Sequence, residues 1–538
     1  MIHKLFLGLT VIAVVIQAYP EGSSSYVEDD AIMHPRRIYP KNSRIAQEEF
    51  QSDYWIKQAQ ATLKAKKEKE LNKNVAKNVI MFLGDGLSIG TIKAARVWSG
   101  QQRGEDGEAT QLAMEEFPYA GLSKTYCLDA QTADSACSAT AYLAGVKTND
   151  GAIGVNGQSV NCATNLDESN HVYSIAKWSQ DVGKKTGIVT TTRVTHASPA
   201  GVYAHVPNRD WESNTGNADC ADIAHQLLYG ETGKNINVIL GGGRERFLPN
   251  TTIDVEGSSG LRVDGRDLIE EWLNTKAGSK ATYIWNRAEL LSVDIDNDYL
   301  LGLFEAEHMQ YYLDVVDDPL EPTLAEMTEV AIKMLEKSEN GYFLFVEGGR
   351  IDMAHHGNLA KKSLAETVQF SEAIEVAKRL TSEEDTLIVV TSDHSHVFSQ
   401  GGYPPRGNDI LGIGGRGKDS ILYTSLSYAN GPGYRQEVDG ARHDFSAYDL
   451  SDKELRFPAL VQLSSETHSG EDVGIFARGP WAHLLSGVLE QNVIPHVMAY
   501  ASCVGDGATA CKDSSSNILS SKLFLMLCLS IVYLRRYV

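Results

Sequence analysis

Five short apolar runs constrain the fold more than any other feature of this sequence. They are rich in Val, Ile, Leu and Phe and occupy residues 78–86, 186–198, 238–243, 341–352 and 385–396. Helical patterns lie between them, for example at 323–337 and 361–380. Strands that are apolar throughout and alternate with helices form parallel sheets covered on both faces. The sequence therefore predicts an α/β fold with a doubly wound, mostly parallel central sheet and helices on both faces.

Four of these five runs finish in side chains that bind metal ions. The side chains are Asp85, Ser198, Glu347 and the pair Asp393–His394. In open α/β sheets, ligands bind beyond the carboxyl ends of the strands. Chance would place acids and histidines at both ends of the strands, so their gathering at one end predicts a functional site.

A zinc site is indicated by histidines near the last two runs. Asp352 and His356 are four residues apart, so on a helix both side chains project from one face. His468 is a further candidate, far away in sequence, and Asp393–His394 is a second pair of acid and imidazole. Imidazole combined with carboxylate suits zinc. Each of these residues alone reads as an ordinary core or surface residue, but together, at strand ends, they favour metal ligation.

Oxygen ligands alone suit a different ion. Asp85, Ser198 and Glu347 offer two carboxylates and a hydroxyl, and magnesium prefers oxygen. Without the two acids, Ser198 would be read as a turn residue before Pro199.

The stretch QTADSACSAT, residues 131–140, contains an acid and a serine before a run of small residues that predicts a helix. Asp134 or Ser135 is a natural helix N-cap, because both side chains accept hydrogen bonds from free backbone N–H groups. The alternative is that Ser135 is a nucleophile placed where a helix end attracts anions.

Both ends of the chain predict targeting signals. Residues 1–18 have the charge, short apolar stretch and small final residue of a secretory signal peptide. Residues 514–538 have the small residues, polar spacer and apolar tail of a glycosylphosphatidylinositol (GPI) attachment signal, with Ser514 or Asp513 as the attachment point. A spanning helix is the alternative, since Arg535 and Arg536 resemble a stop-transfer flank. The tail is short for a span, which needs about 20 residues.

Cysteines and charge agree with secretion. We expect disulfides Cys162–Cys220 and Cys503–Cys511, and free thiols at Cys127 and Cys137. Asn250 begins a glycosylation sequon. The formal net charge is −21, and because phosphate backbones bind Lys and Arg, we expect no nucleic-acid partner.

The rest of the chain divides around the predicted sheet. Residues 19–46 form a polar N-terminal segment that Arg36–Arg37 could mark for processing, and the predicted catalytic domain spans 47–511. Glu48 to Leu71 predicts an exposed, basic helix. Residues 402–466, rich in Gly, Pro and Tyr, predict an inserted surface subdomain rather than a long loop.

Six motifs in order resemble those of the alkaline phosphatases. They are FLGDG, TADSACSATAYLAGVKTN, TTTRVTHASPAGVYAH, FLFVEGGRIDMAHH, VTSDHSHVF and ETHSGEDV. The resemblance runs from about Glu48 to Cys511 and is greatest to the animal, membrane-anchored members, so the 402–466 insertion is similar to their crown subdomain.

The resemblance implies a role for each matching residue. Ser135 matches the nucleophile that becomes phosphoserine, and Arg209 matches the residue that grips the phosphate. The implied zinc ligands are Asp352, His356 and His468 for one ion, and Asp85, Asp393 and His394 with the Ser135 oxygen for the other. The implied magnesium ligands are Asp85, Ser198 and Glu347, with His196 nearby.

Met353 departs from the family pattern, and a further group of residues matches a calcium site. Many animal members have a second histidine directly after the aspartate of EGGRID, where this chain has Met353. Animal members also hold calcium, and Phe304 (through its carbonyl), Glu305 and Glu321 match that site. The fourth calcium ligand falls near Asp254 or Glu256.

The resemblance implies hydrolysis of phosphate monoesters, either small molecules or surface phosphoproteins, at the outer face of the cell membrane. It implies two Zn²⁺ and one Mg²⁺ per subunit, a Ca²⁺, and a homodimer with the 48–71 helix and the 402–466 insertion as contacts. A phosphodiesterase or sulfatase on a similar scaffold is one alternative. A surface adhesion protein without catalysis is another, and it predicts at least one substituted metal ligand.

Overall fold

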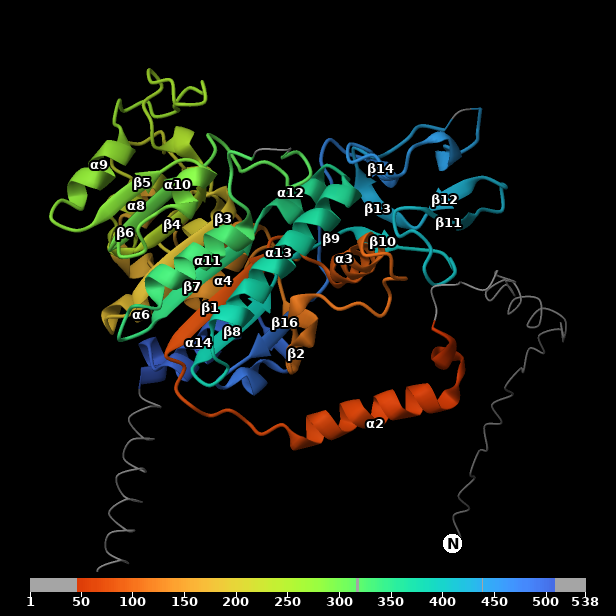
Figure 1. Cartoon of the computed structure of the whole chain (residues 1–538). Coiled ribbons are helices and arrows are strands. Elements are labelled where there is room, and N and C mark those ends of the chain that lie inside the picture. The colour runs from red at the N-terminus through yellow and green to blue at the C-terminus, as the bar shows by residue number, and fades with distance from the viewer. Residues whose placement is uncertain (1–45, 316–318, 438, 509–538) are drawn as a thin grey trace, which may run out of the picture. The chain divides into compact units, whose positions relative to one another are not determined.

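The computed structural model describes residues 46–315, 319–437 and 439–508, and its centre is a ten-stranded sheet (Figure 1). The strand order is β17-β2-β16-β8-β1-β7-β3-β4-β6-β5. The strands are β1 (Asn78–Gly84), β2 (Tyr119–Lys124), β3 (Lys185–Arg193), β4 (Val238–Gly242), β5 (Ala281–Ile284), β6 (Tyr299–Leu303), β7 (Tyr342–Gly348), β8 (Thr386–Thr391), β16 (Val473–Arg478) and β17 (Gly487–Glu490). From β8 to β5 all neighbours are parallel, and β16 is antiparallel to both of its neighbours. The predicted α/β fold with a mostly parallel sheet is confirmed.

The five predicted runs form adjacent strands in the middle of this sheet. They are β8, β1, β7, β3 and β4. The strands that the sequence pattern missed lie outside these five: β17, β2 and β16 on one side, β6 and β5 on the other. Several of these outer strands are only partly buried, as in β2 and β5, so they lack the unbroken apolar run of a central strand.

Helices cover both faces of the sheet, and successive β1 residues enter two separate cores. Ile80 and Phe82 pack with residues of α3, α11 and α13, whereas Val79, Met81 and Leu83 pack with residues of α4, α6, α8, α9 and α14. This alternation is the period of two expected of a strand buried on both sides. The helices are α2 (Ser52–Glu68), α3 (Ile89–Gln102), α4 (Ser135–Ala144), α5 (Cys162–Asn165), α6 (Ile175–Asp181), α7 (Ala197–Ala200), α8 (Ile223–Tyr229), α9 (Leu268–Thr275), α10 (Arg287–Leu291), α11 (Leu324–Leu335), α12 (Arg350–His356), α13 (Ala360–Leu380) and α14 (Val493–Ser502).

The stretch around the predicted insertion has secondary structure of its own. One small sheet contains β10 (Phe398–Gln400), β13 (Leu426–Gly431) and β14 (Ala459–Gln462), and another contains β11 (Ile413–Arg416) and β12 (Leu422–Thr424). Just outside the insertion, β9 (Ser395–His396) pairs with β15 (His468–Ser469), His396 opposite His468. The segments that flank the insertion on its two sides therefore lie next to each other.

One prediction about the cysteines is wrong. Cys127 and Cys137 are not free thiols but form a disulfide, since their Cα atoms are 5.7 Å apart. The Cys162–Cys220 disulfide is present as predicted. Cys503 is disulfide-bonded, and Cys511, its predicted partner, lies outside the described residues.

The exposed helix predicted at 48–71 is α2, which has no buried residue. The predicted signal peptide and anchor signal, residues 1–18 and 514–538, lie outside the described residues. Within the part of the chain that the structure describes, no helix has the length and apolarity to cross a membrane.

Candidate active site

Ser135 is the first residue of α4, and Asp134 caps that helix. The Asp134 carboxylate accepts the backbone N–H of Cys137 at 3.0 Å, and its carbonyl accepts the Ser138 hydroxyl at 2.6 Å. The capping role is therefore filled by Asp134. Ser135, 2% exposed, lies at a helix N-terminus with its hydroxyl free for another function.

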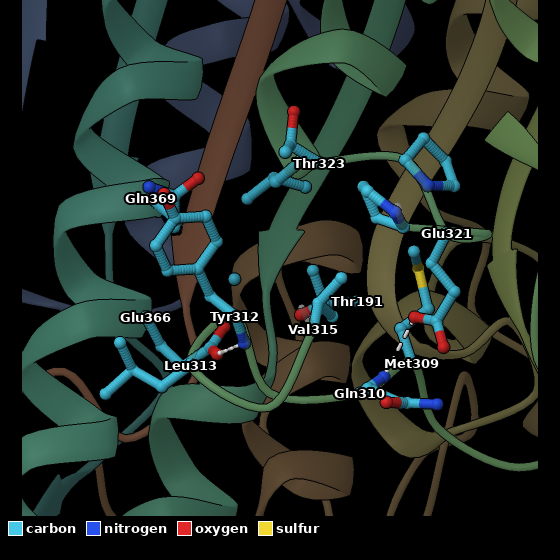
Figure 2. A pocket seen from close by; sticks show the side chains of 14 residues that line it. Thr191, Met309, Gln310, Tyr312, Leu313, Val315, Glu321, Thr323, Glu366 and Gln369 are labelled. Atoms are coloured by element: carbon cyan, nitrogen blue, oxygen red, sulfur yellow. Dashed lines mark hydrogen bonds between the residues drawn. The ribbon is translucent and has the colours of Figure 1, made fainter. Parts of the chain in front are cut away.

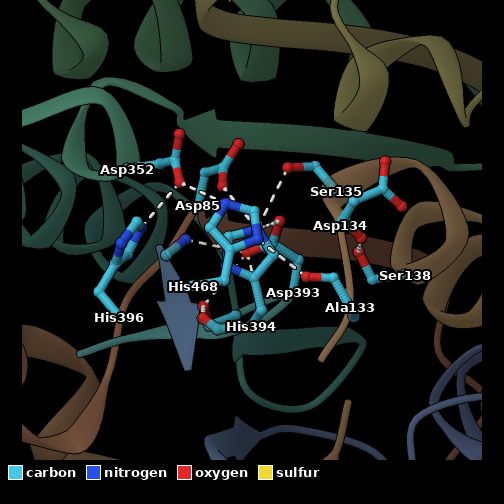
Figure 3. Close-up of polar contacts among 12 residues, drawn as sticks. Asp85, Ala133, Asp134, Ser135, Ser138, Asp352, Asp393, His394, His396 and His468 are labelled. Carbon is cyan, nitrogen blue, oxygen red and sulfur yellow. Dashed lines mark hydrogen bonds and ion pairs between the residues drawn. The ribbon is translucent and has the colours of Figure 1, made fainter. Parts of the chain in front are cut away.

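The parallel register places the predicted acids at one edge of the sheet. Leu83 of β1 lies opposite Glu347 of β7 on one side and Thr391 of β8 on the other. Asp85 and Asp393 each follow two residues later, so both leave the sheet at the same level. Figure 3 shows Asp85, Asp393, His394 and Ser135 directed toward one point.

The side chains of Asp352, His356 and His468 meet around one position. The Nε2 atoms of the two imidazoles are 3.2 Å apart, and each is 3.3 Å from Asp352 Oδ1. Each ring's Nδ1 lies against a carbonyl: His468 against Ala133 at 2.8 Å and His356 against Glu466 at 2.6 Å. When each Nδ1–H donates to its carbonyl, two Nε2 lone pairs and a carboxylate face one another. That arrangement fits a cation.

Electrostatics point the same way. Burial disfavours a charged imidazole, but the Asp352 carboxylate outweighs it and raises the pKa of His356 to about 9. The position between these groups therefore attracts positive charge.

His396 and Glu466 belong to this cluster and were missed from the sequence. His396 lies 2.7 Å from Asp352 Oδ1 through Nε2 and 2.5 Å from Glu466 Oε2 through Nδ1. Glu466 is also held by the backbone N–H of Val397 at 2.8 Å. The imidazole thus links a buried carboxylate to a predicted metal ligand and orients it. The available signal was spacing, because His396 lies two residues after His394 and Glu466 two residues before His468.

A second cluster adjoins Ser135. His394 Nε2 lies 3.0 Å from Asp393 Oδ2, 3.6 Å from Asp85 Oδ1 and 3.2 Å from Ser135 Oγ. Asp85, Asp393 and His394 are fully buried. Both Asp85 oxygens and Asp393 Oδ2 have no hydrogen-bond partner. Because buried carboxylates need a donor or a cation, these orphaned oxygens fit a metal ion.

The predicted magnesium ligands, Asp85, Ser198 and Glu347, adjoin this second cluster, since Asp85 belongs to both groups. Glu347 accepts from Thr192 at 3.1 Å and from Thr190 through Oε2, while its Oε1 has no partner. Burial raises the pKa of Glu347 to about 7, although Thr190, Thr192 and Ser198 lower it by hydrogen bonding. Burial and the carboxylates of Asp393, Asp352 and Glu347 raise the pKa of Asp85 well above its usual range. When ionised, these buried carboxylates repel one another, and a divalent cation bound between them relieves that repulsion.

Arg209 reaches the same edge from a distant loop. Its guanidinium donates to Asp134 Oδ2 at 3.0 Å and to His196 Nε2 at 3.0 Å. Its backbone N–H donates to Gly151 at 2.8 Å. His196 in turn lies within 4.8 Å of ligand oxygens of Asp85 and Glu347. Arg209 is thus fixed next to the residue that precedes Ser135.

The predicted calcium residues also gather. Phe304 follows β6, and Glu305 comes next in the chain. Glu321 accepts the Gln310 backbone N–H through Oε2 at 2.9 Å, but its buried Oε1 has no partner. Burial, a contact with Glu305 and the charge of Glu256 raise the pKa of Glu321 to about 8. Three carboxylates therefore share this region.

Asp254 and Glu256, the two candidates for a fourth calcium ligand, differ in their surroundings. Asp254 accepts from Arg244 at 2.8 Å and from the backbone N–H groups of Ser258 and Glu256. Glu256 also contacts Arg244, and its charge is among the main causes that raise the pKa of Glu321. This difference favours Glu256.

A separate cavity of about 490 Å³ lies next to α13 (Figure 2). Its lining is largely apolar, but polar residues including Gln310, Glu366 and Gln369 also line it, as does Glu321 of the predicted calcium group. It borders Thr191 and Gly348, but none of the predicted zinc or magnesium ligands lines it. The chemistry therefore lies at the clustered acids and imidazoles rather than in this cavity.

This chain is similar to known proteins over most of its length. A family profile for alkaline phosphatase matches residues 76–504. The chain is 48% identical over 510 residues to the tissue-nonspecific isozyme of alkaline phosphatase of Rattus norvegicus, with 92% of this chain and 97% of that protein covered. It is 45% identical over 516 residues to the membrane-bound alkaline phosphatase of Bombyx mori, with 92% and 94% covered. The solved structure of Thermus thermophilus alkaline phosphatase aligns with a TM-score of 0.58 at 23% identity, over 80% of this chain and 92% of that one.

Proposed function

Because this chain belongs to the alkaline phosphatase family and is a metal-dependent phosphomonoesterase, we propose that it acts through a phosphoserine formed at Ser135. One observation carries the proposal. The Ser135 hydroxyl, freed from capping by Asp134, lies 3.2 Å from His394 beside carboxylate oxygens that have no partner. A serine hydroxyl is a weak nucleophile at neutral pH and needs such activation.

The donor sets decide which ions fit. Two imidazoles and a carboxylate suit zinc, and an imidazole with two carboxylates suits a second zinc, whereas the oxygen-only group suits magnesium. The proposed zinc ligands are Asp352, His356 and His468 for one ion and Asp85, Asp393 and His394 for the other, and the proposed magnesium ligands are Asp85, Ser198 and Glu347. When bound, these ions lower the pKa of a hydroxyl group and stabilise the charge on the attacking and leaving oxygens.

The chain's own residues then divide the work. Ser135 Oγ attacks phosphorus, a P–Oγ bond forms, and the ester P–O bond breaks to release the alcohol. Arg209 donates N–H groups to phosphoryl oxygens, and the free N–H groups at the start of α4 face the same anion. Water then attacks the phosphoserine, which releases inorganic phosphate and restores the Ser135 hydroxyl.

The test is the variant Ser135→Ala on 4-nitrophenyl phosphate. We expect loss of the acid-stable phosphoenzyme and a fall in kcat of at least about 10³-fold, since the nucleophile is removed. Ser138→Ala, the same change in the same helix, is the matched control and should retain most turnover. Near-normal turnover by Ser135→Ala would refute the assignment. Faster hydrolysis of 4-nitrophenyl sulfate or bis(4-nitrophenyl) phosphate would favour a sulfatase or diesterase.

A calcium ion is the fourth proposed cofactor. The proposed ligands are Glu256, Glu305, Glu321 and the Phe304 carbonyl, a set of hard oxygens. The partnerless oxygen of Glu321 and the mutual influence of the three acids support it. Calcium should raise the melting temperature of the wild type, and this rise should be smaller in the Glu321→Gln variant. An unchanged gain would exclude this site.

The C-terminal sequence supports a proposal for the cellular location of the enzyme. The Bombyx mori relative is membrane-bound, and we propose a GPI anchor at Ser514 or Asp513 at the extracellular face of the cell membrane. A phosphatidylinositol-specific lipase should then release the activity from membranes, whereas a spanning helix would keep it bound. Asn250 is exposed, as a glycosylated residue must be.

We also propose a homodimer. The described chain leaves four large apolar side chains of α2 exposed, and a second copy could cover them. They are Tyr54, Trp55, Ile56 and Leu63. Polar replacements there should shift the particle mass measured by light scattering from dimer to monomer. For the domain limits we propose a catalytic domain at 47–511 that contains the insertion at 402–466.

A further inference from the structure

We propose that the Cys127–Cys137 disulfide is a positioning element of the active site. It joins the segment after β2 to the third residue of α4, two residues beyond Ser135. Both half-cystines are buried, at 3% and 2% exposure. The bond closes a short ring, residues 127–137, that contains the nucleophile.

Three consecutive residues of this ring contact three different parts of the site. The Ala133 carbonyl lies 2.8 Å from Nδ1 of His468, a proposed zinc ligand. The Asp134 carboxylate holds Arg209 at 3.0 Å, and Ser135 Oγ lies 3.2 Å from His394. Figure 3 shows Ala133, Asp134 and Ser135 side by side around the imidazoles. A shift of the ring would therefore disturb the nucleophile, the phosphate grip and a metal ligand together.

Packing alone gives the irregular part of this ring, residues 127–134, little support, whereas Ala136 at its helical end lies in one of the large cores. Residues 125–134 form neither helix nor strand. Their apolar contacts form a separate small cluster of Cys127, Ala133 and Cys137, with Ala130 against it, apart from the two large cores of the sheet. Because burial of so few small side chains contributes little, the covalent bond supplies the fixed geometry that packing does not. Positional errors near 1 Å can cost about 10²-fold in rate.

The second disulfide offers a matched control. Cys162 and Cys220 are 58 residues apart, whereas Cys127 and Cys137 are 10 apart. The stabilisation that a disulfide gains from loop closure grows with the length of the loop. If both bonds only stabilised the fold, loss of Cys162–Cys220 would lower the melting temperature more, and neither loss would change the kinetics of the folded enzyme.

The experiment compares two double variants of the zinc-loaded full chain. For Cys127→Ala/Cys137→Ala we expect kcat/KM on 4-nitrophenyl phosphate to fall at least about tenfold. We also expect weaker inhibition by inorganic phosphate and faster zinc loss to a chelator. For Cys162→Ala/Cys220→Ala we expect a lower melting temperature, with all three of these quantities within about twofold of the wild type. The inference is overturned if the first variant keeps the kinetics and zinc retention of the wild type.

A second measurement covers the case in which the first variant does not fold. The wild-type holoenzyme is treated with a phosphine reductant at rising urea concentrations, and free thiols are alkylated and mapped by mass spectrometry. Activity should fall in step with opening of Cys127–Cys137 rather than of Cys162–Cys220. Full activity after Cys127–Cys137 has opened would refute the inference.

This inference rests on Ser135 being the nucleophile, and the two failures are distinguishable. Turnover by Ser135→Ala would overturn the proposed function. An inactive Ser135→Ala together with wild-type kinetics in the Cys127→Ala/Cys137→Ala variant would overturn only the role of the disulfide.

Discussion

Asp134 performs two jobs that one substitution can separate. Its Oδ1 caps α4 by accepting the Cys137 N–H, and its Oδ2 pairs with Arg209. Asp134→Asn retains an oxygen for the cap, and Asn is as good an N-cap as Asp. The same change removes the negative charge opposite Arg209. We therefore expect phosphate binding to weaken while the helix keeps its stability.

The magnitude follows from the exposure of the pair. A hydrogen bond that involves a charged group contributes about 1.5–3 kcal/mol. The Asp134 and Arg209 side chains are 15% and 25% exposed, so solvent screening favours the lower end of this range. Since 1.4 kcal/mol corresponds to about tenfold in affinity, the inhibition constant of inorganic phosphate should rise about tenfold. Asp134→Ala should lose about 1 kcal/mol of stability as well, because the cap disappears.

The assay measures phosphate inhibition and thermal unfolding for the wild type and both variants, all loaded with metal. Asp134→Asn should melt near the wild type, and Asp134→Ala should melt lower. Both variants should bind phosphate about equally weakly. The reasoning is refuted if Asp134→Asn binds phosphate as tightly as the wild type, or if it melts as early as Asp134→Ala.

Three further predictions concern the metals and a buried histidine. Glu466→Gln removes the charge behind His396 and should weaken zinc retention about 10–100-fold in a chelator competition; retention equal to the wild type would contradict the link. Stripping the metals should abolish turnover and lower the melting temperature, since Asp85, Asp393 and Glu347 repel one another when no cation is present, and zinc with magnesium should restore both. Burial lowers the pKa of His205 from 6.5 to about 4. Between these two pH values His205 binds a proton in the unfolded chain but not in the folded chain, so the free energy of unfolding falls as the pH drops below 6.5. In urea titrations, the loss of stability between pH 7 and pH 5 should be about 2 kcal/mol smaller in His205→Gln than in the wild type.

The centre of the fold was predictable because its strands are buried on both faces. Such strands carry unbroken apolar runs, and these mark β1, β3, β4, β7 and β8 directly in the sequence. Since parallel strands end at one edge, the position of Asp85, Glu347 and Asp393 followed from the same pattern. The chain order of the motifs then supplied His468, which no local periodicity connects to the sheet.

Other features depended on contacts that chain order does not reveal. Cys127 and Cys137 have small neighbours suited to free thiols, and only the turn before α4 brings them together. His396, which precedes the insertion, contacts Asp352, and Glu466, the last residue of the insertion, contacts His396. Partly buried outer strands such as β2 have mixed burial and so no clear periodic signal. His396 and Glu466 were missed because each takes its role from a partner distant in sequence, whereas the two cysteines are 10 residues apart and β2 has no periodic pattern.

The two-stranded ladder of β9 and β15 has an evolutionary consequence. His396 and His468 face each other across it. The two ends of the segment between them are therefore held together next to the active site. Closing a longer or shorter loop on fixed ends costs little, since the entropy changes only with the logarithm of its length. The length and sequence of the loop between these two histidines can therefore change between related chains, provided that its last residues keep Glu466 against His396.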